Sequence, residues 1–282
     1  MKTLATGGAF ASRYGPWAIV TGASDGIGRE MARDLARRGV KLMLVARRGE
    51  LLRTLAADLH RAYETEAVVM AVDLSSADGR RAVIDASGAL DVGLLVAAAG
   101  FGTSGDFVDI ALEAERDMLA VNCLAVLELT HHLAPRLLSR GRGGIVLLSS
   151  LLAFQGAARS AHYAATKAWV QTLSEGLRIE LAPHGVDVVA SAPGPVSSGF
   201  AARAGMVMTS TTPAEVVARQ TLDALGRRGT VRPGWLSKQL GWSLATLPRL
   251  GRAAVLSRVM ARMTSYQPGG KGHSARPDGS PR

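Results

Sequence analysis

The sequence predicts an α/β fold, in which a single domain is built on one doubly wound parallel sheet of about seven strands with helices on both faces. Short apolar runs rich in Val, Ile and Leu alternate with helical patterns, and the first run leads directly into a glycine-rich turn. Runs this short favour strands that are buried on both faces, and repeated strand–helix alternation is typical of a parallel sheet. The runs are WAIVT at 17–21, KLMLVA at 41–46, AVVMAV at 67–72, GLLVA at 93–97, GIVLLS at 144–149 and VDVVASA at 186–192.

Helical patterns fill the intervals between these runs. The stretch after the first run places Ile27, Met31 and Leu35 on one side, and Gly39 marks the end of the helix. An apolar stripe of this kind faces a core. We therefore expect this helix to pack on one face of the sheet.

The last quarter of the chain departs from this alternation. Residues 213–226 predict a helix, GTVRP at 229–233 predicts a last short strand, and 235–264 form an apolar and basic helical stretch interrupted at Gly241 and Pro248. The following polar, glycine-rich residues have little to bury and are predicted to be disordered. We expect four regions: an N-terminal extension at 1–14, the α/β domain at 15–232, an apolar and basic helical extension at 233–265 and a disordered tail at 266–282.

The composition limits the classes of protein. With 282 residues, of which 48% are hydrophobic, the chain has enough apolar material for one sizeable core. Its one cysteine, Cys123, excludes an internal disulfide framework and a multi-cysteine metal site, which fits a reducing, cytoplasmic location. The histidines show no HExxH spacing, so we expect no metal. We also expect neither a signal peptide nor a membrane-spanning helix, because no sufficiently long apolar segment occurs.

The net charge of +10 lies in one part of the chain. Residues 1–223 contain 22 basic and 22 acidic residues, whereas 224–282 contain eleven Lys or Arg and one acid, Asp278. No nucleic-acid-binding module accompanies this charge, so we expect no nucleic-acid partner. An apolar and basic helix can lie on an anionic membrane or pack on a neighbouring subunit. The interruptions at Gly241 and Pro248 favour packing.

The first predicted strand runs directly into TGASDGIG at 21–28, and a helix follows. Glycines at these spacings allow a tight turn, let the backbone approach a pyrophosphate and bring helix and strand close together. The helix N-terminus adds free N–H groups and the positive end of the helix dipole. The turn predicts a dinucleotide site, and its candidate cofactor residues are Gly22, Ser24, Asp25, Gly26, Ile27 and Gly28.

The end of the second strand indicates which dinucleotide binds. NAD sites usually place an acid about twenty residues after the glycines, where it binds the ribose 2′-hydroxyl. Here Ala46, Arg47 and Arg48 stand instead, so no carboxylate repels a 2′-phosphate and a guanidinium suits it, although Arg48 also fits a solvated loop. We therefore expect NADP(H) in preference to NAD(H). Asp73 and Leu74, after the third strand, are expected to contact the adenine side.

YAATK at 163–167 places a tyrosine and a lysine four positions apart. In a helix these two positions share one face. A phenol with a pKa of about 10 is a poor acid–base group near neutrality, and a neighbouring cation favours the phenolate. We expect Lys167 to lower the pKa of Tyr163 toward the working range, so that Tyr163 transfers a proton.

Motifs over about residues 15 to 230 resemble, in order, those of the short-chain dehydrogenase/reductase family. They are TGxxxGxG at 21–28, Asn122 in VNCLA, a strand ending in SS at 149–150, YxxxK at 163–167 and PGPV at 193–196. The likeness is to NADP-dependent bacterial reductases, with some similarity to 3-oxoacyl-CoA reductases and 17β-hydroxysteroid dehydrogenases. It implies a Rossmann-type fold and a catalytic tetrad of Asn122, Ser150, Tyr163 and Lys167.

The resemblance implies a role for each member of this tetrad. Tyr163 would move the proton while the cofactor carries the hydride, and Lys167 would hold the nicotinamide ribose. Ser150 would hydrogen-bond the substrate oxygen, and Asn122 would bend its helix and hold a water in a proton relay. The resemblance implies further cofactor contacts from Ala99, Gly100, Pro193, Gly194, Val196 and Ser198.

The chain departs from the family pattern at two places. AAAG at 97–100 replaces the usual NNAG, which removes amides that normally brace the central sheet and the adenosine side. Ser198 stands where a threonine is usual and keeps the hydroxyl. Neither departure removes a proton-transfer group.

The segments that should cover the crevice are mainly apolar, which predicts a pocket for a lipid-like ketone. Its candidate lining residues, several of which could equally pack in the core, are Leu151, Phe154, Phe200, Met206 and Met208, with Gln155 and His162 as polar anchors. We therefore expect an NADP(H)-dependent oxidoreductase acting on an apolar ketone, aldehyde or alcohol. The alternatives are a 3-oxoacyl thioester reductase and a non-catalytic NADP-binding regulatory or scaffold protein. The resemblance suggests a homodimer or homotetramer formed through helices near 111–138 and 161–182, with peripheral membrane contact as an alternative for the basic C-terminal segment.

Overall fold

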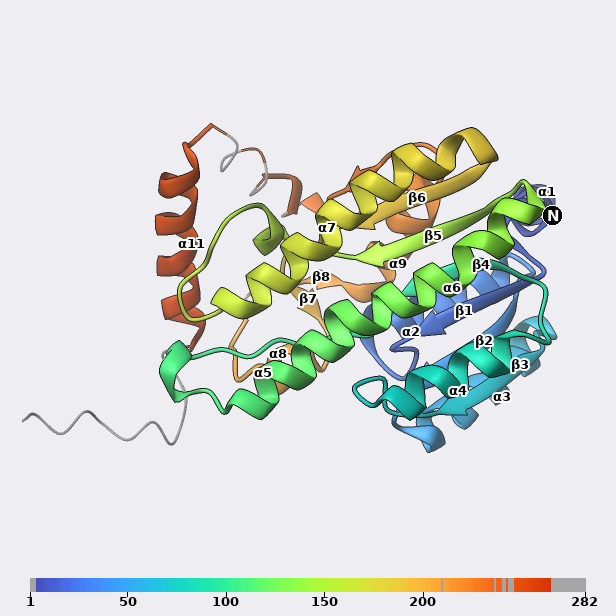
Figure 1. Ribbon diagram of the computed structural model, residues 1–282, viewed down its shortest axis with the longest axis horizontal. Helices are drawn as coiled ribbons and strands as arrows, with labels where there is room; N and C mark the ends of the chain where they lie inside the picture. The colour runs from blue at the N-terminus through green and yellow to red at the C-terminus, as the bar shows by residue number, and fades with distance from the viewer. Residues whose placement is uncertain (1–3, 209, 236, 240–241, 243–245, 265–282) are drawn as a thin grey trace, which may run out of the picture.

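A seven-stranded parallel sheet forms the centre of the molecule (Figure 1). The computed structural model describes residues 4–208, 210–235, 237–239, 242 and 246–264. The strands, in their spatial order, are β3 (Ala67–Ala71), β2 (Lys41–Ala46), β1 (Trp17–Thr21), β4 (Val92–Ala97), β5 (Gly143–Leu148), β6 (Val186–Ser191) and β9 (Thr230–Val231). The order reverses between β1 and β4, and a ligand crevice is expected beyond the carboxyl ends of strands at such a point. The predicted fold class is confirmed.

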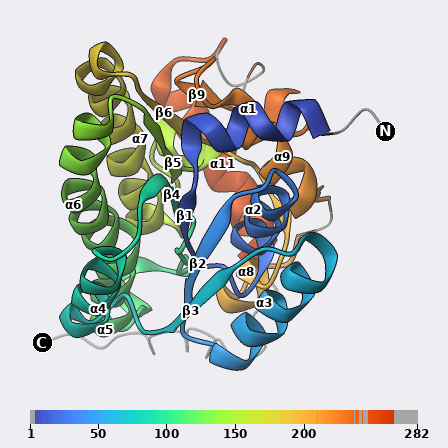
Figure 2. The same cartoon turned by 90° about the vertical axis from the view of Figure 1, so that its right-hand side faces the viewer.

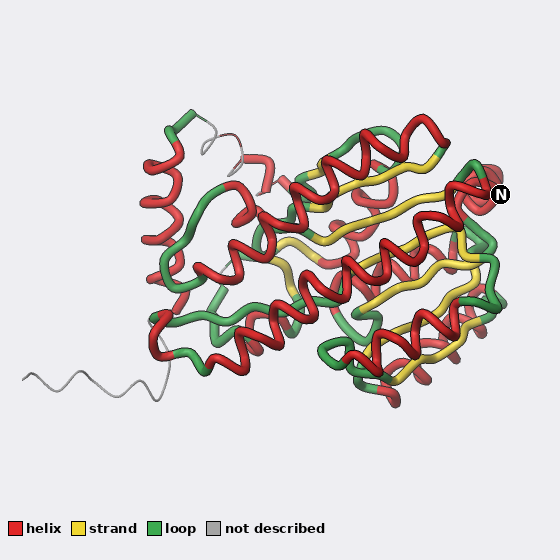
Figure 3. Tube along the Cα trace, viewed as in Figure 1, coloured by secondary structure: helices red, strands yellow, loops and turns green. Residues whose placement is uncertain are grey.

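Helices cover both faces of this sheet (Figures 2 and 3). One layer consists of α2 (Gly26–Arg37), α3 (Gly49–Tyr63) and α9 (Ala214–Ala224), and the other of α4 (Ala77–Ser87), α6 (Ala125–Arg140) and α7 (Ala161–Leu181). Successive strand residues face opposite layers. In β1, Ala18 and Val20 pack in the core beneath α2, whereas Ile19 packs in the core beneath α6. The helices predicted after the first strand and over 213–226 are confirmed.

Short elements build the loops at the carboxyl ends of the strands. α5 (Leu112–Leu119) continues into α6 through a single wide turn at Ala120–Leu124. The other short elements are 3₁₀ turns at Phe107–Asp109, Leu151–Phe154 and Ala182–His184, the one-turn helix α8 (Phe200–Arg203), and the two-residue strands β7 (Val196–Ser197) and β8 (Thr212–Pro213). We call residues 196–208 the substrate loop.

An additional helix, α1 (Leu4–Tyr14), lies at the amino end of the sheet (Figure 1). Tyr14 is buried, and its hydroxyl donates to Asp187 Oδ2 at 2.8 Å. The Arg13 Nε donates to the same carboxylate oxygen at 2.7 Å. The sequence predicts only an extension at 1–14, and the structure shows that most of it is helical. Contacts with the rest of the chain stabilise this helix.

The helix α11 (Arg249–Thr264) packs against its own chain. Hydrogen bonds join it to two loops: Val207 N to Met263 O at 2.9 Å, Ala158 N to Ser257 Oγ at 3.0 Å, and Arg159 Nε to Thr264 Oγ1 at 2.6 Å. We expected this segment to pack on a neighbouring subunit, but its inner face contacts the same chain. Within the described ranges, no helix has the length and apolarity needed to cross a bilayer. The predicted tail at 266–282 lies outside the described residues.

Candidate active site

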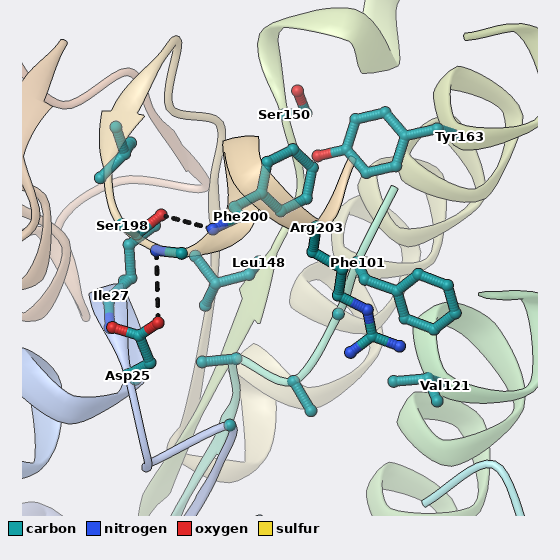
Figure 4. A pocket seen from close by; sticks show the side chains of 18 of the residues that line it. Asp25, Ile27, Phe101, Val121, Leu148, Ser150, Tyr163, Ser198, Phe200 and Arg203 are labelled. Carbon is teal, nitrogen blue, oxygen red and sulfur yellow. Dashed lines mark hydrogen bonds between the residues drawn. The ribbon is translucent and has the colours of Figure 1, made fainter. Parts of the chain in front are cut away.

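One cavity of about 500 Å³ lies at the carboxyl ends of the strands and reaches α11 (Figure 4). Every residue that we predicted to contact the cofactor lines it, from the glycine turn through Arg47 and Asp73 to Ser198. The predicted substrate residues Leu151 and Phe200 line it too, as do two methionines of the substrate loop. Because the parallel sheet brings these strand ends to one edge, segments far apart in sequence share one site.

The glycine turn between β1 and α2 is tight, because two of its glycines lie against other backbone atoms and leave no room for a side chain. Gly22 has a φ of +68°, and a side chain there would approach the backbone N of Ala99 to 2.8 Å. A side chain at Gly28 would overlap the Gly22 carbonyl oxygen. The Asp25 carboxylate accepts from the backbone N of Gly26 at 2.7 Å and caps α2. The backbone of this turn therefore fits a pyrophosphate at the N-terminus of α2.

The two arginines after β2 lie beside this turn. Arg48 donates to Ser24 Oγ at 3.1 Å, and the Arg47 guanidinium lies 3.7 Å from the Asp73 carboxylate. Both arginine side chains are about half exposed. Burial raises the pKa of Asp73, but hydrogen bonds from Ser75 and the charge of Arg47 outweigh it, so the pKa lies below its ordinary value. The arginines are thus free to turn toward an added phosphate.

Three of the predicted catalytic residues, Ser150, Tyr163 and Lys167, line one wall of the cavity. Tyr163 and Lys167 are both buried on α7. Lys167 Nζ donates to the carbonyl of Leu148 at 2.7 Å and lies 5.8 Å from the centre of the Tyr163 ring. Ser150 follows β5, and its hydroxyl faces that of Tyr163 closely enough to lower the pKa of the phenol in part (Figure 4). A substrate oxygen at this wall would meet two hydroxyl groups.

Asn122 lies behind this wall, in the wide turn between α5 and α6, and is fully buried. Its Oδ1 accepts from Phe101 N at 3.1 Å, and its Nδ2 donates to Phe101 O at 2.9 Å and to Thr166 Oγ1 at 3.0 Å. A side chain at Gly100 would meet both Asn122 Oδ1, at 3.0 Å, and Lys167 Nζ, at 3.2 Å. The fold therefore brings all four predicted catalytic residues together.

The titration of the tyrosine differs from our expectation. Burial raises the pKa of Tyr163 to about 12, although the hydroxyl of Ser150 lowers it in part. Burial lowers the pKa of Lys167 to about 8. The predicted lowering of the Tyr163 pKa by Lys167 is therefore wrong for this structure, because the lysine is itself desolvated and donates to the Leu148 carbonyl. The phenol keeps its proton across neutral pH.

Three predicted substrate residues do not line the cavity. The ring of Phe154 packs against Arg232, whose Cζ lies 4.6 Å from the ring centre. Gln155 is buried, and its Nε2 donates to the Leu151 carbonyl at 2.9 Å. His162, in the first turn of α7, contacts the buried carboxylate of Glu115 through Nδ1. Each of these side chains contacts a neighbour in space that holds it away from the cavity, and the sequence does not reveal that contact.

Two departures from the family pattern are accommodated locally. Thr21 Oγ1 accepts from the backbone N of Ala99 at 3.0 Å and so braces the alanine-rich turn after β4. Ser198 Oγ accepts from Phe200 N at 3.4 Å (Figure 4), which orients the first turn of α8. The hydroxyl of Ser198 thus holds the substrate loop.

Sequence reasoning missed two groups of lining residues. Arg203 and Phe101 contact each other in the cavity, with the Arg203 Cζ 3.8 Å from the centre of the ring (Figure 4). The other group belongs to α11 and consists of Leu256, Val259, Met260 and Met263. The apolar spacing of 256, 260 and 263 is that of one helix face and was a usable signal. Nothing local marked Arg203.

Comparison with known proteins agrees with this geometry. The family model "short chain dehydrogenase" matches residues 16–206. The chain is 35% identical over 180 residues to a 7beta-hydroxysteroid dehydrogenase of Clostridium sardiniense, covering 64% of this chain and 69% of that protein. It is 32% identical over 253 residues to a very-long-chain 3-oxoacyl-CoA reductase of Phaeosphaeria nodorum, covering 83% and 73% respectively.

A solved structure extends the likeness to the fold. The short-chain dehydrogenase from Sphingobium yanoikuyae in complex with NADPH matches with a TM-score of 0.75 at 28% identity, covering 90% of this chain and 99% of that one. The family model spans more than half of the chain and includes the glycine turn, Ser150, Tyr163 and Lys167. The protein belongs to the short-chain dehydrogenase family of oxidoreductases.

Proposed function

We propose that this protein is an NADP(H)-dependent oxidoreductase that transfers hydride between the nicotinamide and the carbonyl or hydroxyl group of a large apolar substrate, with Tyr163 as the proton-transferring residue. One observation carries the proposal, namely the arrangement of a single cavity. Tyr163, Lys167 and Ser150 form one wall of it, and the open glycine turn with Arg47 lies at its other end. The glycine turn and Arg47 would bind the phosphates of a dinucleotide, and the wall with Tyr163 would bind the oxygen of a ketone.

NADP(H) fits the residues at the phosphate end. Gly22 and Gly28 leave the backbone open at the N-terminus of α2, and Arg47 and Arg48 supply guanidinium groups for a 2′-phosphate. When bound, the cofactor supplies the hydride chemistry. The Sphingobium structure is a complex with NADPH, which supports this assignment.

In the proposed reaction Tyr163 acts in its protonated form. Burial holds its pKa at about 12, so the phenol can donate a proton to the oxygen on which negative charge develops during carbonyl reduction. Ser150 would hydrogen-bond the same oxygen. Lys167 would hold the nicotinamide ribose, and Asn122 would support a water in the proton relay. Protonated Tyr163 is thus the form that can act as proton donor for carbonyl reduction at neutral pH.

The other side of the cavity favours an apolar substrate. Its lining residues from the substrate loop and α11 include Phe200, Met206, Met208, Leu256, Met260 and Met263. Methionine side chains adapt to irregular apolar shapes. Two relatives are named for steroid and very-long-chain 3-oxoacyl-CoA substrates, both bulky and apolar, which supports a ketone of this size. A 3-oxoacyl thioester remains the alternative substrate.

The function is tested by following NADPH and NADH oxidation at 340 nm with 3-keto, 7-keto and 17-keto steroids, long and short 3-oxoacyl thioesters, and bulky ketones. The Tyr163→Phe variant serves as the blank. We expect turnover of at least one large apolar ketone with NADPH. Tight NADPH binding without turnover of any substrate in this panel would contradict the proposal and favour a non-catalytic role.

The cofactor preference depends on the two arginines after β2. We expect the Arg47→Gln/Arg48→Gln double variant to lower kcat/KM for NADPH by about 30-fold, because two charge-assisted contacts to the 2′-phosphate are lost. The value for NADH should stay within about threefold. Steady-state kinetics with both cofactors check this, and Arg61→Gln, at an exposed position on α3, is the matched control. Equal losses with both cofactors would contradict the assignment.

We expect Met260 to limit the length of substrate that the cavity accepts, because its side chain is buried against the substrate loop. We expect Met260→Trp to raise KM for long or polycyclic ketones by about tenfold and to leave short ketones unchanged. Val255→Trp, on the outer face of α11, is the matched control, since Val255 does not line the cavity. An equal change for short and long ketones would show that α11 does not limit substrate length.

We propose that copies of the chain associate through the outer faces of α5, α6 and α7. These faces carry large apolar side chains that are exposed to solvent: Leu112, Leu119, Leu127, Trp169 and Ile179. Sedimentation equilibrium checks this, and a monomer at micromolar concentration would contradict it.

The outer face of α11 is an alternative surface for membrane contact, because Leu250 is exposed there beside arginines. Failure to co-sediment with anionic vesicles would remove it.

A further inference from the structure

Arg203 is the last residue of α8 in the substrate loop, and its guanidinium enters the cavity (Figure 4). Its Cζ lies 3.8 Å from the centre of the Phe101 ring, a stacked cation–π contact. Phe101 itself packs in a small cluster with Tyr163 and Met118. The guanidinium is therefore held at a fixed place beside the catalytic wall.

Two contacts fix the loop around this arginine. On one side of it, the backbone N of Gly199 donates to Asp25 Oδ2 at 3.2 Å, which ties the loop to the glycine turn (Figure 4). On the other side, Ser104 Oγ donates to the carbonyl of Ala204 at 2.5 Å. The loop on either side of Arg203 is thus tied to the rest of the chain, once at the glycine turn and once at Ser104.

Arg203 has no anionic partner among the residues that the structure describes. The other two arginines of the cavity are each near a carboxylate, Arg47 near Asp73 and Arg48 near Asp25. Burial, and then the positive charge of Arg47, lower the pKa of Arg203 below its ordinary value. Arg203 is therefore the arginine of this cavity that contacts no carboxylate among the described residues, and the carboxylates of Asp73 and Asp117 oppose the lowering of its pKa only in part.

We propose that Arg203 binds a phosphate group in this cavity. A guanidinium is planar and presents paired N–H donors that match phosphate oxygens. Stacking on Phe101 presets its position and reduces the entropy lost on binding. The inference rests on the proposed function for its ligand. The phosphate comes either from the dinucleotide or from a CoA thioester substrate.

The test is equilibrium binding of NADPH, NADH and CoA to the full-length protein, measured by calorimetry for the wild type, Arg203→Gln and Arg203→Lys. We expect Arg203→Gln to raise the Kd of its ligand by about tenfold or more and Arg203→Lys to recover part of that loss. If the Kd values of NADPH and NADH rise equally, Arg203 binds the pyrophosphate, and if only the Kd of NADPH rises, it binds the 2′-phosphate. If only the Kd of CoA rises, Arg203 binds a phosphate of the CoA substrate.

The controls separate the possible failures. Arg61→Gln removes the same charge at an exposed position on α3 and should leave all three Kd values unchanged. Thermal unfolding verifies that each variant is folded. If the wild type does not bind NADPH, the proposed function fails. If the wild type binds it and Arg203→Gln binds NADPH, NADH and CoA as the wild type does, only the role of Arg203 is overturned.

Discussion

The Tyr163→Phe variant is expected to lose turnover by about 10³-fold while NADPH binding stays within about twofold of wild type. The substitution removes only the hydroxyl that would give the proton to the substrate oxygen. The ring would keep its contacts, since Tyr163 packs with Phe101 and Met118 and its centre lies 5.4 Å from that of Phe200. The loss should therefore appear in kcat, with thermal stability nearly unchanged.

Single-turnover measurements with saturating NADPH separate this chemical step from binding. Tyr63→Phe, at an exposed position in the last turn of α3, is the matched control and should behave as wild type. Residual activity above one tenth of wild type would show that another group supplies the proton. It would then be necessary to test Ser150 as the donor.

The Lys167→Met variant is expected to lose activity and gain stability together. Lys167 is buried and its pKa is lowered to about 8, so below that pH the folded protein contains a poorly solvated ammonium group. Replacing it with an apolar side chain of similar length removes this penalty. We expect the thermal midpoint without cofactor to rise by about 3 °C or more, and kcat to fall by about 10²-fold or more.

The pH dependence of this gain has a definite sign. Because the folded-state pKa of Lys167, about 8, lies below its ordinary value of 10.5, the folded state releases this proton first. Wild-type stability from this group therefore rises with pH between about 8 and 10.5 and is lost as pH falls through 8. The raised pKa of Tyr163 acts only above pH 10, the ordinary value for tyrosine.

Thermal unfolding at pH 6.5, 8.0 and 9.5 checks this prediction. The advantage of Lys167→Met should be largest at pH 6.5 and smallest at pH 9.5. Lys238→Met, at an exposed position, is the matched control and should show no such trend. An advantage that does not change with pH would mean that packing, and not the buried charge, determines the stability difference.

The parts of this site that sequence could predict are those carried by short-range patterns. The glycine turn follows the first strand directly, and the resemblance to the family identified the four catalytic candidates by their motifs. A parallel sheet must bring its strand ends to one edge. The direction of the Tyr163 pKa shift could not be predicted, because it depends on how deeply Lys167 is buried. That depth follows from the packing of α7 on the sheet.

Most of the misassigned and missed residues are placed by contacts with residues distant in the sequence, whereas Gln155 is held by the Leu151 carbonyl four positions before it. His162 was expected in the pocket, but Glu115, 47 positions earlier, holds it elsewhere. Met260 and Arg203 enter the cavity because α11 folds back onto the substrate loop and because Phe101 holds a guanidinium. No window of neighbouring residues contains that information. The apolar spacing of residues 256, 260 and 263 indicates one apolar face on α11 but not the surface that this face covers.

The positions of α1 and α11 have a practical consequence for handling the protein. α1 lies at the amino end of the sheet, whereas α11 lines the cavity at the carboxyl end (Figure 1). An affinity tag or surface linker fused before α1 stands at the far side of the molecule from the reaction. A fusion placed directly after α11 would lie beside the cavity that this helix lines. For immobilised biocatalysis, the amino-terminal side is therefore the side to anchor.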